Sequence, residues 1–263
     1  MLQHARAIVT AAVALSVVVL ATPVAAQVTD DESKCQIGAS LAVSKFVTDK
    51  SKCLIKCEQG ARKSLNPASD CDPDFAGTTQ ACVQRAEDKA TGLEQSKCAK
   101  DCPECYQGGD CAADSNARVE DAENQVEVLA ALVYCDDSGS TDGLSAAEAK
   151  CADTTAKTLS NFAKKKLNCY AKCRKTEHQG SIPAGSCTPP ASDATTQACI
   201  QKEETKAAFL IDKKCDPNVS SNADSPDCWA GRTGTQWAAL VESAVDMGQS
   251  SLYCASPSGA FLD

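Results

Sequence analysis

The sequence has few aromatic side chains, two methionines and two histidines among its 263 residues. Only His178 lies beyond the N-terminal region, which excludes a three-histidine zinc site, and no C-x-x-C-H motif for haem attachment occurs. The formal net charge of −9, without a basic block, makes nucleic acid an unfavourable partner. No alternating β-branched runs indicate strands, and no nucleophilic serine motif accompanies the histidine. These absences predict an all-α protein that is not an enzyme and carries no cofactor.

Long apolar runs are confined to the start of the sequence. Arg6 precedes an apolar run over residues 7–20, and Pro23 and a short segment ending at Ala26 follow it. This is the layout of a secretory signal peptide. A membrane anchor is the alternative, but a span needs about 20 apolar residues and Pro23 ends this run early. We therefore expect a signal peptide over residues 1–26 and a mature protein that is secreted or periplasmic, without a membrane span.

Cysteine is the residue that the sequence has in abundance. All 18 cysteines follow the predicted cleavage site. In an oxidising compartment, a dense and even-numbered cysteine set predicts a disulfide framework, whereas in the cytosol it would indicate metal binding. We expect two matching sets of structural disulfide cysteines and one extra pair. The first set is Cys35, Cys53, Cys57, Cys71, Cys82, Cys98, Cys111 and Cys135; the second is Cys151, Cys169, Cys173, Cys187, Cys199, Cys215, Cys228 and Cys254; the extra pair is Cys102 and Cys105.

The cysteine spacing repeats along the chain. Each cysteine of the first set has its counterpart in the second set 116 to 119 residues later. The pentapeptide Thr-Thr-Gln-Ala-Cys at residues 78–82 recurs at residues 195–199. Such a match indicates a tandem duplication. We expect cysteine-rich helical repeats over residues 27–135 and 145–263, joined by a polar linker over residues 136–144.

Helical periodicity predicts three helices in each repeat. Cys35, Cys53 and Cys57 are spaced by whole turns, which places them on one helix face with Phe46. Thr29 and Ser145 are each followed three residues later by glutamate, the spacing of a capping box. The expected helices run approximately over residues 31–62, 78–97 and 115–134 in the first repeat, and 195–214 and 233–253 in the second, whose first helix follows Ser145.

A disulfide framework would compensate for the small number of large apolar side chains. Apolar burial contributes about 25 cal/mol per Å², whereas one disulfide contributes typically about 2–4 kcal/mol. We expect four bridges in each repeat. The spacing does not determine their connectivity, but an up-down-up arrangement brings Cys53 or Cys57 near Cys82, and Cys35 near Cys98.

The first repeat carries a residue pattern that extends beyond its cysteines. The pattern is Lys34-Cys35-Gln36, Phe46, Lys52-Cys53, Lys56-Cys57, Pro67, Cys71 and Lys97-Cys98. It resembles a loose group of exported bacterial proteins that are built of cysteine-linked helical repeats and have no assigned function. The resemblance covers both repeats and implies a disulfide-linked helical fold. It implies no catalytic residues in this chain, because the group has no catalytic residues that could be assigned to it.

Pairs of cysteines four residues apart suggest one alternative function. Each pair places two thiols on one helix face and is similar to the pairs of copper-storage helical bundles, in which thiolates bind the soft ion Cu(I). The same spacings suit disulfide bridges, which is the interpretation we favour. The pairs are Cys53/Cys57, Cys98/Cys102 and Cys169/Cys173.

The C-x-x-C motif at residues 102–105 suggests another alternative function. In thioredoxin-like sites, such a motif performs thiol–disulfide exchange through a thiolate at a helix N-terminus. Here the motif follows a predicted helix and no βαβ pattern surrounds it. We expect Cys102 and Cys105 to close a local loop or to pair elsewhere.

Three further features have an ordinary structural interpretation. The linker fails as an EF-hand calcium loop because Asp142 occupies the glycine position and Gly139 a ligand position. His178 follows a basic run, as expected at a solvated helix end. Trp229 and Trp237 have no counterparts in the first repeat, and we expect core packing of the third helix rather than a binding patch.

The sequence therefore predicts an exported, non-enzymatic, disulfide-rich helical repeat protein, with two tandem three-helix domains. It would act as a structural or binding module in the periplasm or outside the cell, with a protein or cell-surface partner that the sequence does not identify. The alternatives are sequestration of Cu(I) or another soft metal by C-x-x-x-C thiolates, and thiol–disulfide exchange at Cys102 and Cys105.

Overall fold

The computed structural model describes residues 28–106, 109–135, 144–216 and 225–254. Regular structure in these residues is helical, without a strand, so the all-α class is confirmed for this part of the chain. The predicted signal peptide and most of the predicted linker lie outside the described residues. The helices are α1 (Asp30–Ala61), α2 (Gly77–Cys98), α3 (Cys111–Tyr134), α4 (Ala146–His178), α5 (Ala194–Cys215), α6 (Gly234–Met247) and α7 (Gln249–Tyr253), with short 3-10 helices η1 (Ala68–Cys71) and η2 (Asp227–Trp229).

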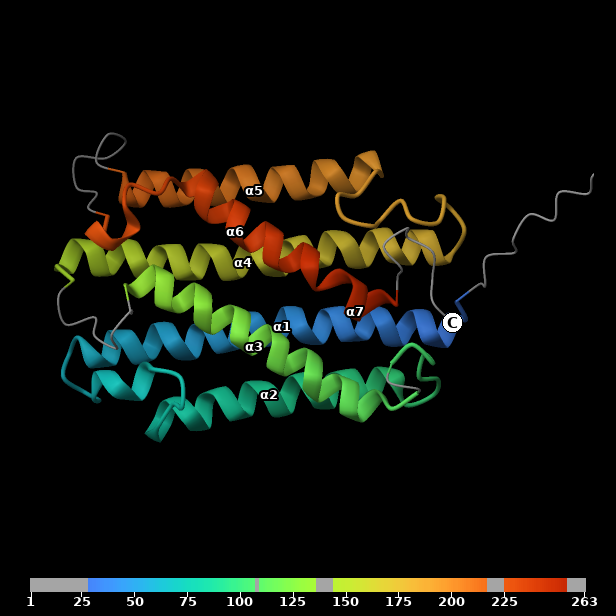
Figure 1. Ribbon diagram of the computed structural model, residues 1–263, viewed down its shortest axis with the longest axis horizontal. Coiled ribbons are helices and arrows are strands. Elements are labelled where there is room, and N and C mark those ends of the chain that lie inside the picture. The colour runs from blue at the N-terminus through green and yellow to red at the C-terminus, as the bar shows by residue number, and fades with distance from the viewer. Residues whose placement is uncertain (1–27, 107–108, 136–143, 217–224, 255–263) are drawn as a thin grey trace, which may run out of the picture.

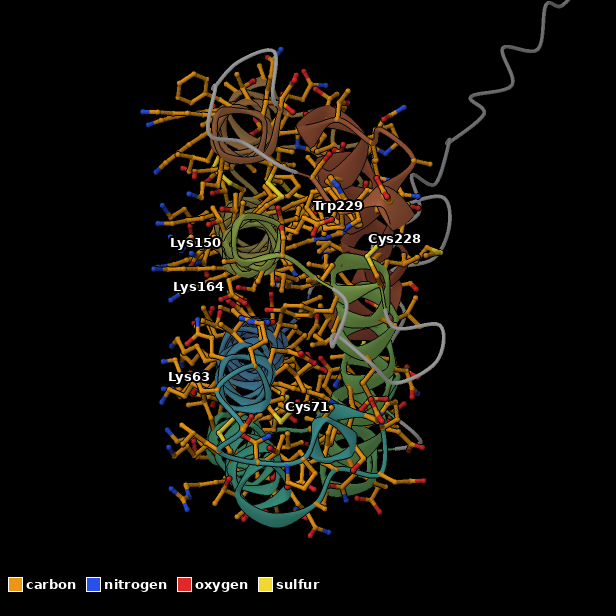
Figure 2. The ribbon with its side chains drawn as sticks, turned by 90° about the vertical axis from the view of Figure 1, so that its left-hand side faces the viewer. Lys63, Cys71, Lys150, Lys164, Cys228 and Trp229 are labelled. Atoms are coloured by element: carbon orange, nitrogen blue, oxygen red, sulfur yellow. A yellow bond between two sulfur atoms is a disulfide. The ribbon has the colours of Figure 1, made fainter. Side chains whose placement is uncertain are left out.

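The helices form two layers. In the first layer α2, α1, α4 and α5 lie side by side in this order (Figure 1). In the second layer α3 packs on α1 and α2, α6 packs on α4 and α5, and α7 reaches α1. The end-on view in Figure 2 shows α3 and α6 on one side of the first layer only. In the described part of the chain, the other side of that layer therefore has no helix over it.

Side chains at the helix starts explain why the two longest helices begin where the sequence predicts. Thr29 accepts a hydrogen bond from the backbone N–H of Glu32, whose carboxylate accepts one from the Thr29 N–H. Ser145 and Glu148 make the same reciprocal bonds at the start of α4. Both predicted capping boxes are therefore confirmed.

The third helix of each half differs from its expected bounds. Asp110 accepts hydrogen bonds from two backbone N–H groups of the following turn, so α3 begins at Cys111 rather than near residue 115. In the second half, the expected helix over residues 233–253 is interrupted at Gly248, which separates α6 from α7. No helix in the described part has the length and apolar character needed to cross a membrane.

Three disulfides of the first half, residues 28–135, have equivalents in the second half, residues 144–254. The sequence separations are 63 and 64 residues for the first equivalent pair, 29 and 30 for the second, and 14 in both halves for the third. Two of the expected pairings, Cys35 with Cys98 and Cys53 with Cys82, are present. The equivalent bridges are Cys35–Cys98 and Cys151–Cys215, Cys53–Cys82 and Cys169–Cys199, and Cys57–Cys71 and Cys173–Cys187.

The remaining three disulfides have no equivalent in the other half. Cys102 is bonded to Cys111, and Cys105 is bonded to Cys254 of the second half. Cys102 and Cys105 therefore do not bond to each other; each pairs elsewhere, which is one of the two outcomes expected for them. The physical reason is the packing of the turn that carries them, because the Tyr106 hydroxyl donates a hydrogen bond of 2.7 Å to the Leu252 carbonyl and holds this turn against α7.

The expectation of four bridges in each repeat is wrong for the second half. A second bridge between the halves joins Cys135 to Cys228, so the second half keeps only its three internal disulfides. Cys135 and Cys254 are equivalent in sequence, but their partners Cys228 and Cys105 are not. The reason is again tertiary, because the ends of the third helices meet the opposite half rather than their own.

The two halves also share one apolar core. A single buried cluster contains Phe46 and Val133 from the first half and Phe162 and Trp237 from the second. Across this boundary, the Trp229 indole N–H donates a hydrogen bond of 3.0 Å to the Val133 carbonyl. The halves are therefore packed together by side chains as well as joined by sulfur.

Each half buries one lysine completely, at equivalent positions of α1 and α4. The Lys50 ammonium forms ion pairs with Glu123 and Glu127 of α3. The Lys166 ammonium forms ion pairs with two carboxylates of α6, Glu242 at 2.9 Å and Asp246 at 2.8 Å. Because an unpaired buried charge is strongly unfavourable, these contacts fix where α3 and α6 cross the first layer.

Candidate binding surface

The cysteine motifs present disulfides rather than thiols. All 18 cysteines are bonded in nine disulfides. The two members of each C-x-x-x-C pair bond to different partners, as Cys53 does to Cys82 and Cys57 to Cys71. In this oxidised form, the pairs do not offer the thiolates on which the Cu(I) alternative depends.

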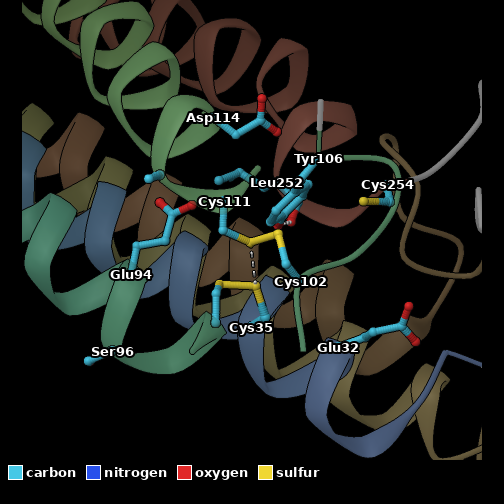
Figure 3. Close-up of a disulfide and its surroundings, with 12 residues drawn as sticks. Glu32, Cys35, Glu94, Ser96, Cys102, Tyr106, Cys111, Asp114, Leu252 and Cys254 are labelled. Carbon is cyan, nitrogen blue, oxygen red and sulfur yellow. Dashed lines mark hydrogen bonds between the residues drawn. A yellow bond between two sulfur atoms is a disulfide. The ribbon is translucent and has the colours of Figure 1, made fainter. Parts of the chain in front are cut away.

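Sulfur atoms of two disulfides gather where α1 and α2 meet the start of α3. The Sγ atoms of Cys35, Cys98 and Cys111 lie within 4.8 Å of one another. In Figure 3 a dashed line joins Cys35 to the Cys102–Cys111 bridge, with Tyr106 beside it. These are disulfide sulfurs, not thiolates, and the C-x-x-C motif is likewise not a dithiol here.

His178 is not at a solvated helix end. Its Nδ1 lies 2.6 Å from the Ser33 hydroxyl, so it links the end of α4 to the first turns of α1. Burial first, and the nearby Arg174 guanidinium second, lower the pKa of His178 to about 4. The neutral ring is thus a structural contact between the halves.

The two tryptophans pack in the core, as expected. Their exposed fractions are 1% for Trp229 and 0% for Trp237, and their ring centroids are 4.9 Å apart in an edge-to-face arrangement. Trp229 belongs to η2 rather than to the third helix. The polar linker that fails the EF-hand pattern falls mostly on residues 136–143, which lie outside the described residues.

The uncovered side of the first layer carries a concentration of lysines. Figure 2 shows Lys63, Lys150 and Lys164 on the side of the molecule away from α3 and α6. The other exposed lysines of α1 and α4 lie at helical spacings that place them on this same side. We name this surface the lysine face; it comprises Lys34, Lys45, Lys52 and Lys56 of α1 and Lys150, Lys157, Lys164, Lys165, Lys172 and Lys175 of α4.

Helix α4 supplies the strongest part of the lysine face. Among the described residues, the lysine ion pairs of α4 are those of buried Lys166, and none of its outward lysines has one. On α1, by contrast, Asp49 pairs with Lys45 at 3.0 Å and with Lys52 at 3.2 Å. The positive potential of the face is therefore greatest over α4.

A groove opens on the lysine face between α1, α4 and α5. Its volume is about 340 Å³. Ile37 and Leu41 of α1 give it an apolar wall, and Lys172 and Lys175 of α4 give it a basic rim. A smaller hollow of about 180 Å³ follows, and both are lined by Lys165 and Glu203. Apolar surface bordered by ammonium groups suits an anionic partner with an apolar part.

The net charge of the opposite layer is negative. Helix α3 has five acidic side chains against one basic, whereas α4 has eight basic against three acidic. Helix α6 has two acidic side chains and no basic one. The net charge of −9 therefore conceals a separation of charge between the two layers.

The spacing of lysines along the sequence contains a signal for the lysine face. Lys150, Lys157 and Lys164 recur every seven residues, so they lie on one face of a helix. Interpreting the basic residues only as a solvated helix end missed this spacing. The spacing does not show whether another helix covers the face, which required the tertiary structure.

The described residues define the protein as a cysteine-rich, disulfide-linked, all-helical protein. No protein-family model matches the chain, and no curated protein or solved structure matches it.

Proposed function

We propose that this chain is an exported, non-enzymatic binding module that presents the lysine face to a partner in the periplasm or outside the cell. The observation that carries the proposal is the face itself: no described helix covers this side of the first layer, and within the described residues the outward lysines of α4 have no ion pair. The signal-peptide layout of residues 1–26 supports export. The nine disulfides are consistent with an oxidising compartment.

The disulfides support a binding role because they hold the face in a fixed shape. Cys35–Cys98 and Cys53–Cys82 fix α1 against α2, and Cys151–Cys215 and Cys169–Cys199 fix α4 against α5. A surface that is ordered before binding does not lose that conformational entropy on association. The lysine face is thus a preformed surface rather than one that orders on contact.

We further propose that the halves are copies of one three-helix unit, formed by tandem duplication. The equivalent disulfides and the equivalent buried lysines, Lys50 and Lys166, support this origin. Because α1 and α4 are the equivalent helices and lie side by side, duplication would double one basic helix face into a broad surface.

Export is tested with the full chain expressed in a bacterium. The proposal predicts a mature protein that begins at Gln27, is found outside the cytoplasm and has no free thiol. Intact mass and alkylation of each cell fraction measure this. An uncleaved, reduced protein that remains in the cytoplasm would contradict export.

Binding is tested with the mature, oxidised protein and envelopes isolated from the organism that makes it. We expect saturable, salt-sensitive binding that is strongly reduced in the variant Lys157→Gln/Lys164→Gln/Lys175→Gln. The matched control is Asn116→Glu/Asn124→Glu/Gln125→Glu, which changes the net charge equally at exposed positions of α3. Equal binding by the lysine variant and the unaltered protein would contradict a role for the face.

A further inference from the structure

We infer that the lysine face docks on an anionic lipid bilayer, at the phosphate headgroups of its extracytoplasmic surface. The inference rests on the proposed function and identifies the partner of that face. It depends on three features that occur together: a flat array of lysines, exposed leucines beside them, and a net positive charge on the first layer against a net negative charge on the second.

The size and shape of the face fit an extended planar partner. Helices α1 and α4 have 32 and 33 residues, which makes each nearly 50 Å long at about 1.5 Å per residue. On α4 the outward lysines extend from Lys150 near its start to Lys175 in its last turn. The end-on view shows the helices of this layer stacked in a line, with the labelled lysines along one edge (Figure 2). The charges are therefore spread over a plane and do not converge on one point.

The chemistry of the charges also favours a membrane surface. The outward charges of α4 are lysines, and its one arginine, Arg174, is buried. Arginine provides a planar fork that recognises individual phosphates or carboxylates, whereas lysine provides a compact charge on a flexible stem. Such stems can lie along apolar material while the ammonium groups remain among the headgroups. The face is thus suited to a surface that carries many phosphates, none of which has to be recognised individually.

Two exposed leucines favour a lipid surface over a soluble acidic polymer as the partner of the lysine face. Leu41 of α1 is 42% exposed beside Lys172 in the groove, and Leu210 of α5 is 39% exposed beside Lys206 in the adjoining hollow. A hydrated polysaccharide or polyphosphate gains little from contact with leucine. A bilayer interface accepts such side chains at the boundary of headgroups and acyl chains. We therefore assign the face to lipid.

The acidic side chains of α3 and α6 do not cancel this attraction. They lie in the second layer, and one helix with its side chains is about 10 Å thick. The Debye length at 0.1 M salt is also about 10 Å, so solvent screens their repulsion from a surface that touches the lysine face. Each lysine close to an anionic leaflet strengthens binding by about fivefold.

The test uses sedimentation of the mature, oxidised protein with two kinds of vesicle, phosphatidylcholine alone and phosphatidylcholine mixed with phosphatidylglycerol. We expect binding to the mixed vesicles that falls steeply with added salt, and little binding to phosphatidylcholine. The variant Lys157→Gln/Lys164→Gln/Lys175→Gln should bind the mixed vesicles about a hundredfold more weakly. The control Asn116→Glu/Asn124→Glu/Gln125→Glu, on the α3 side, should bind almost as the unaltered protein does. Circular dichroism verifies that both variants remain helical.

The variant Leu41→Ser distinguishes a lipid partner from a soluble polymer. It should weaken binding to mixed vesicles several-fold and leave binding to heparin, a soluble polyanion, unchanged. Binding to heparin without binding to mixed vesicles would overturn the inference, as would an equal loss in the lysine variant and its α3 control. If envelopes bind the protein through the lysine face but mixed vesicles do not, this inference fails and the proposed function stands.

Discussion

The Sγ atoms of Cys35 and Cys111 lie 3.8 Å apart, although the two cysteines belong to different disulfides. Cys35 is bonded to Cys98, and Cys111 to Cys102. A thiolate attacks a disulfide by direct contact with one of its sulfurs. A thiolate formed at Cys111 is therefore already next to a sulfur that it can attack, so the disulfide pattern can rearrange at this junction.

The variant Cys102→Ser tests this relationship. It leaves Cys111 as a thiol beside the Cys35–Cys98 bridge, and we expect Cys111 to attack Cys35, form Cys35–Cys111 and release Cys98. Peptide mapping by mass spectrometry after an acid quench measures the product. The double variant Cys102→Ser/Cys111→Ser should keep Cys35–Cys98. The account is wrong at this point if the single variant also keeps only Cys35–Cys98.

The buried ion pairs of Lys50 should contribute strongly to stability. The variant Lys50→Met leaves Glu123 and Glu127 close together without their cation, and we expect the free energy of unfolding to fall by about 3 kcal/mol. Lys52→Met, at an exposed position two residues away, should change it by less than about 0.5 kcal/mol. Urea unfolding with the disulfides intact measures both. Equal stability of the two variants would show that the buried pair contributes nothing.

Two glycines in helices should respond in opposite ways to alanine. A Cβ at Gly234 would lie 2.2 Å from the Ala208 carbonyl oxygen, whereas a Cβ at Gly92 would meet no atom within 4 Å. We expect Gly234→Ala to lower the free energy of unfolding by about 2 kcal/mol because α6 must move away from α5. Gly92→Ala should raise it by about 0.5–1 kcal/mol, since alanine is the better helix former. Urea midpoints of the two variants test the close approach, and a stable Gly234→Ala protein would contradict it.

The partly buried His178 should make stability fall in acid. Burial lowers its pKa to about 4 in the folded protein, against about 6.5 in the unfolded chain. The unfolded state therefore takes up a proton first, so the contribution of this group is complete above pH 6.5 and is lost as the pH falls towards 4. The loss should be roughly 1–2 kcal/mol, because the ring retains some contact with solvent.

The variant His178→Gln is the comparison for that pH dependence. It keeps a polar side chain that can reach Ser33 but does not titrate. Between pH 7 and pH 4, the unaltered protein should lose more stability than the variant, as measured by urea unfolding at each pH. Parallel pH profiles would show that His178 does not titrate as its surroundings imply.

Much of the fold was accessible from local sequence patterns. The spacing of Cys35, Cys53 and Cys57 along whole turns predicted a helix that faces its partner with these sulfurs, and all three are buried in disulfides. The capping boxes at Thr29 and Ser145 likewise depend only on residues three apart. Such features are local, so the chain encodes them without reference to tertiary packing.

The features that the sequence did not predict depend on how the halves pack. Cys105 bonds to Cys254 across a separation of 149 residues, and no spacing within a repeat indicates that contact. The lysine face depends on tertiary structure in the same way. The seven-residue spacing of Lys150, Lys157 and Lys164 defines one side of α4. That this side has no described helix over it follows only from the positions of α3 and α6.

The central claim is that sulfur–sulfur bonds within and between the halves hold this helical protein together. Intact mass spectrometry tests it most directly, on protein taken from its natural compartment and alkylated without reductant. The account predicts no added alkyl group, and subsequent peptide mapping should recover Cys105–Cys254 and Cys135–Cys228. A protein that is alkylated on all its cysteines and is still fully helical and cooperatively folded would contradict it.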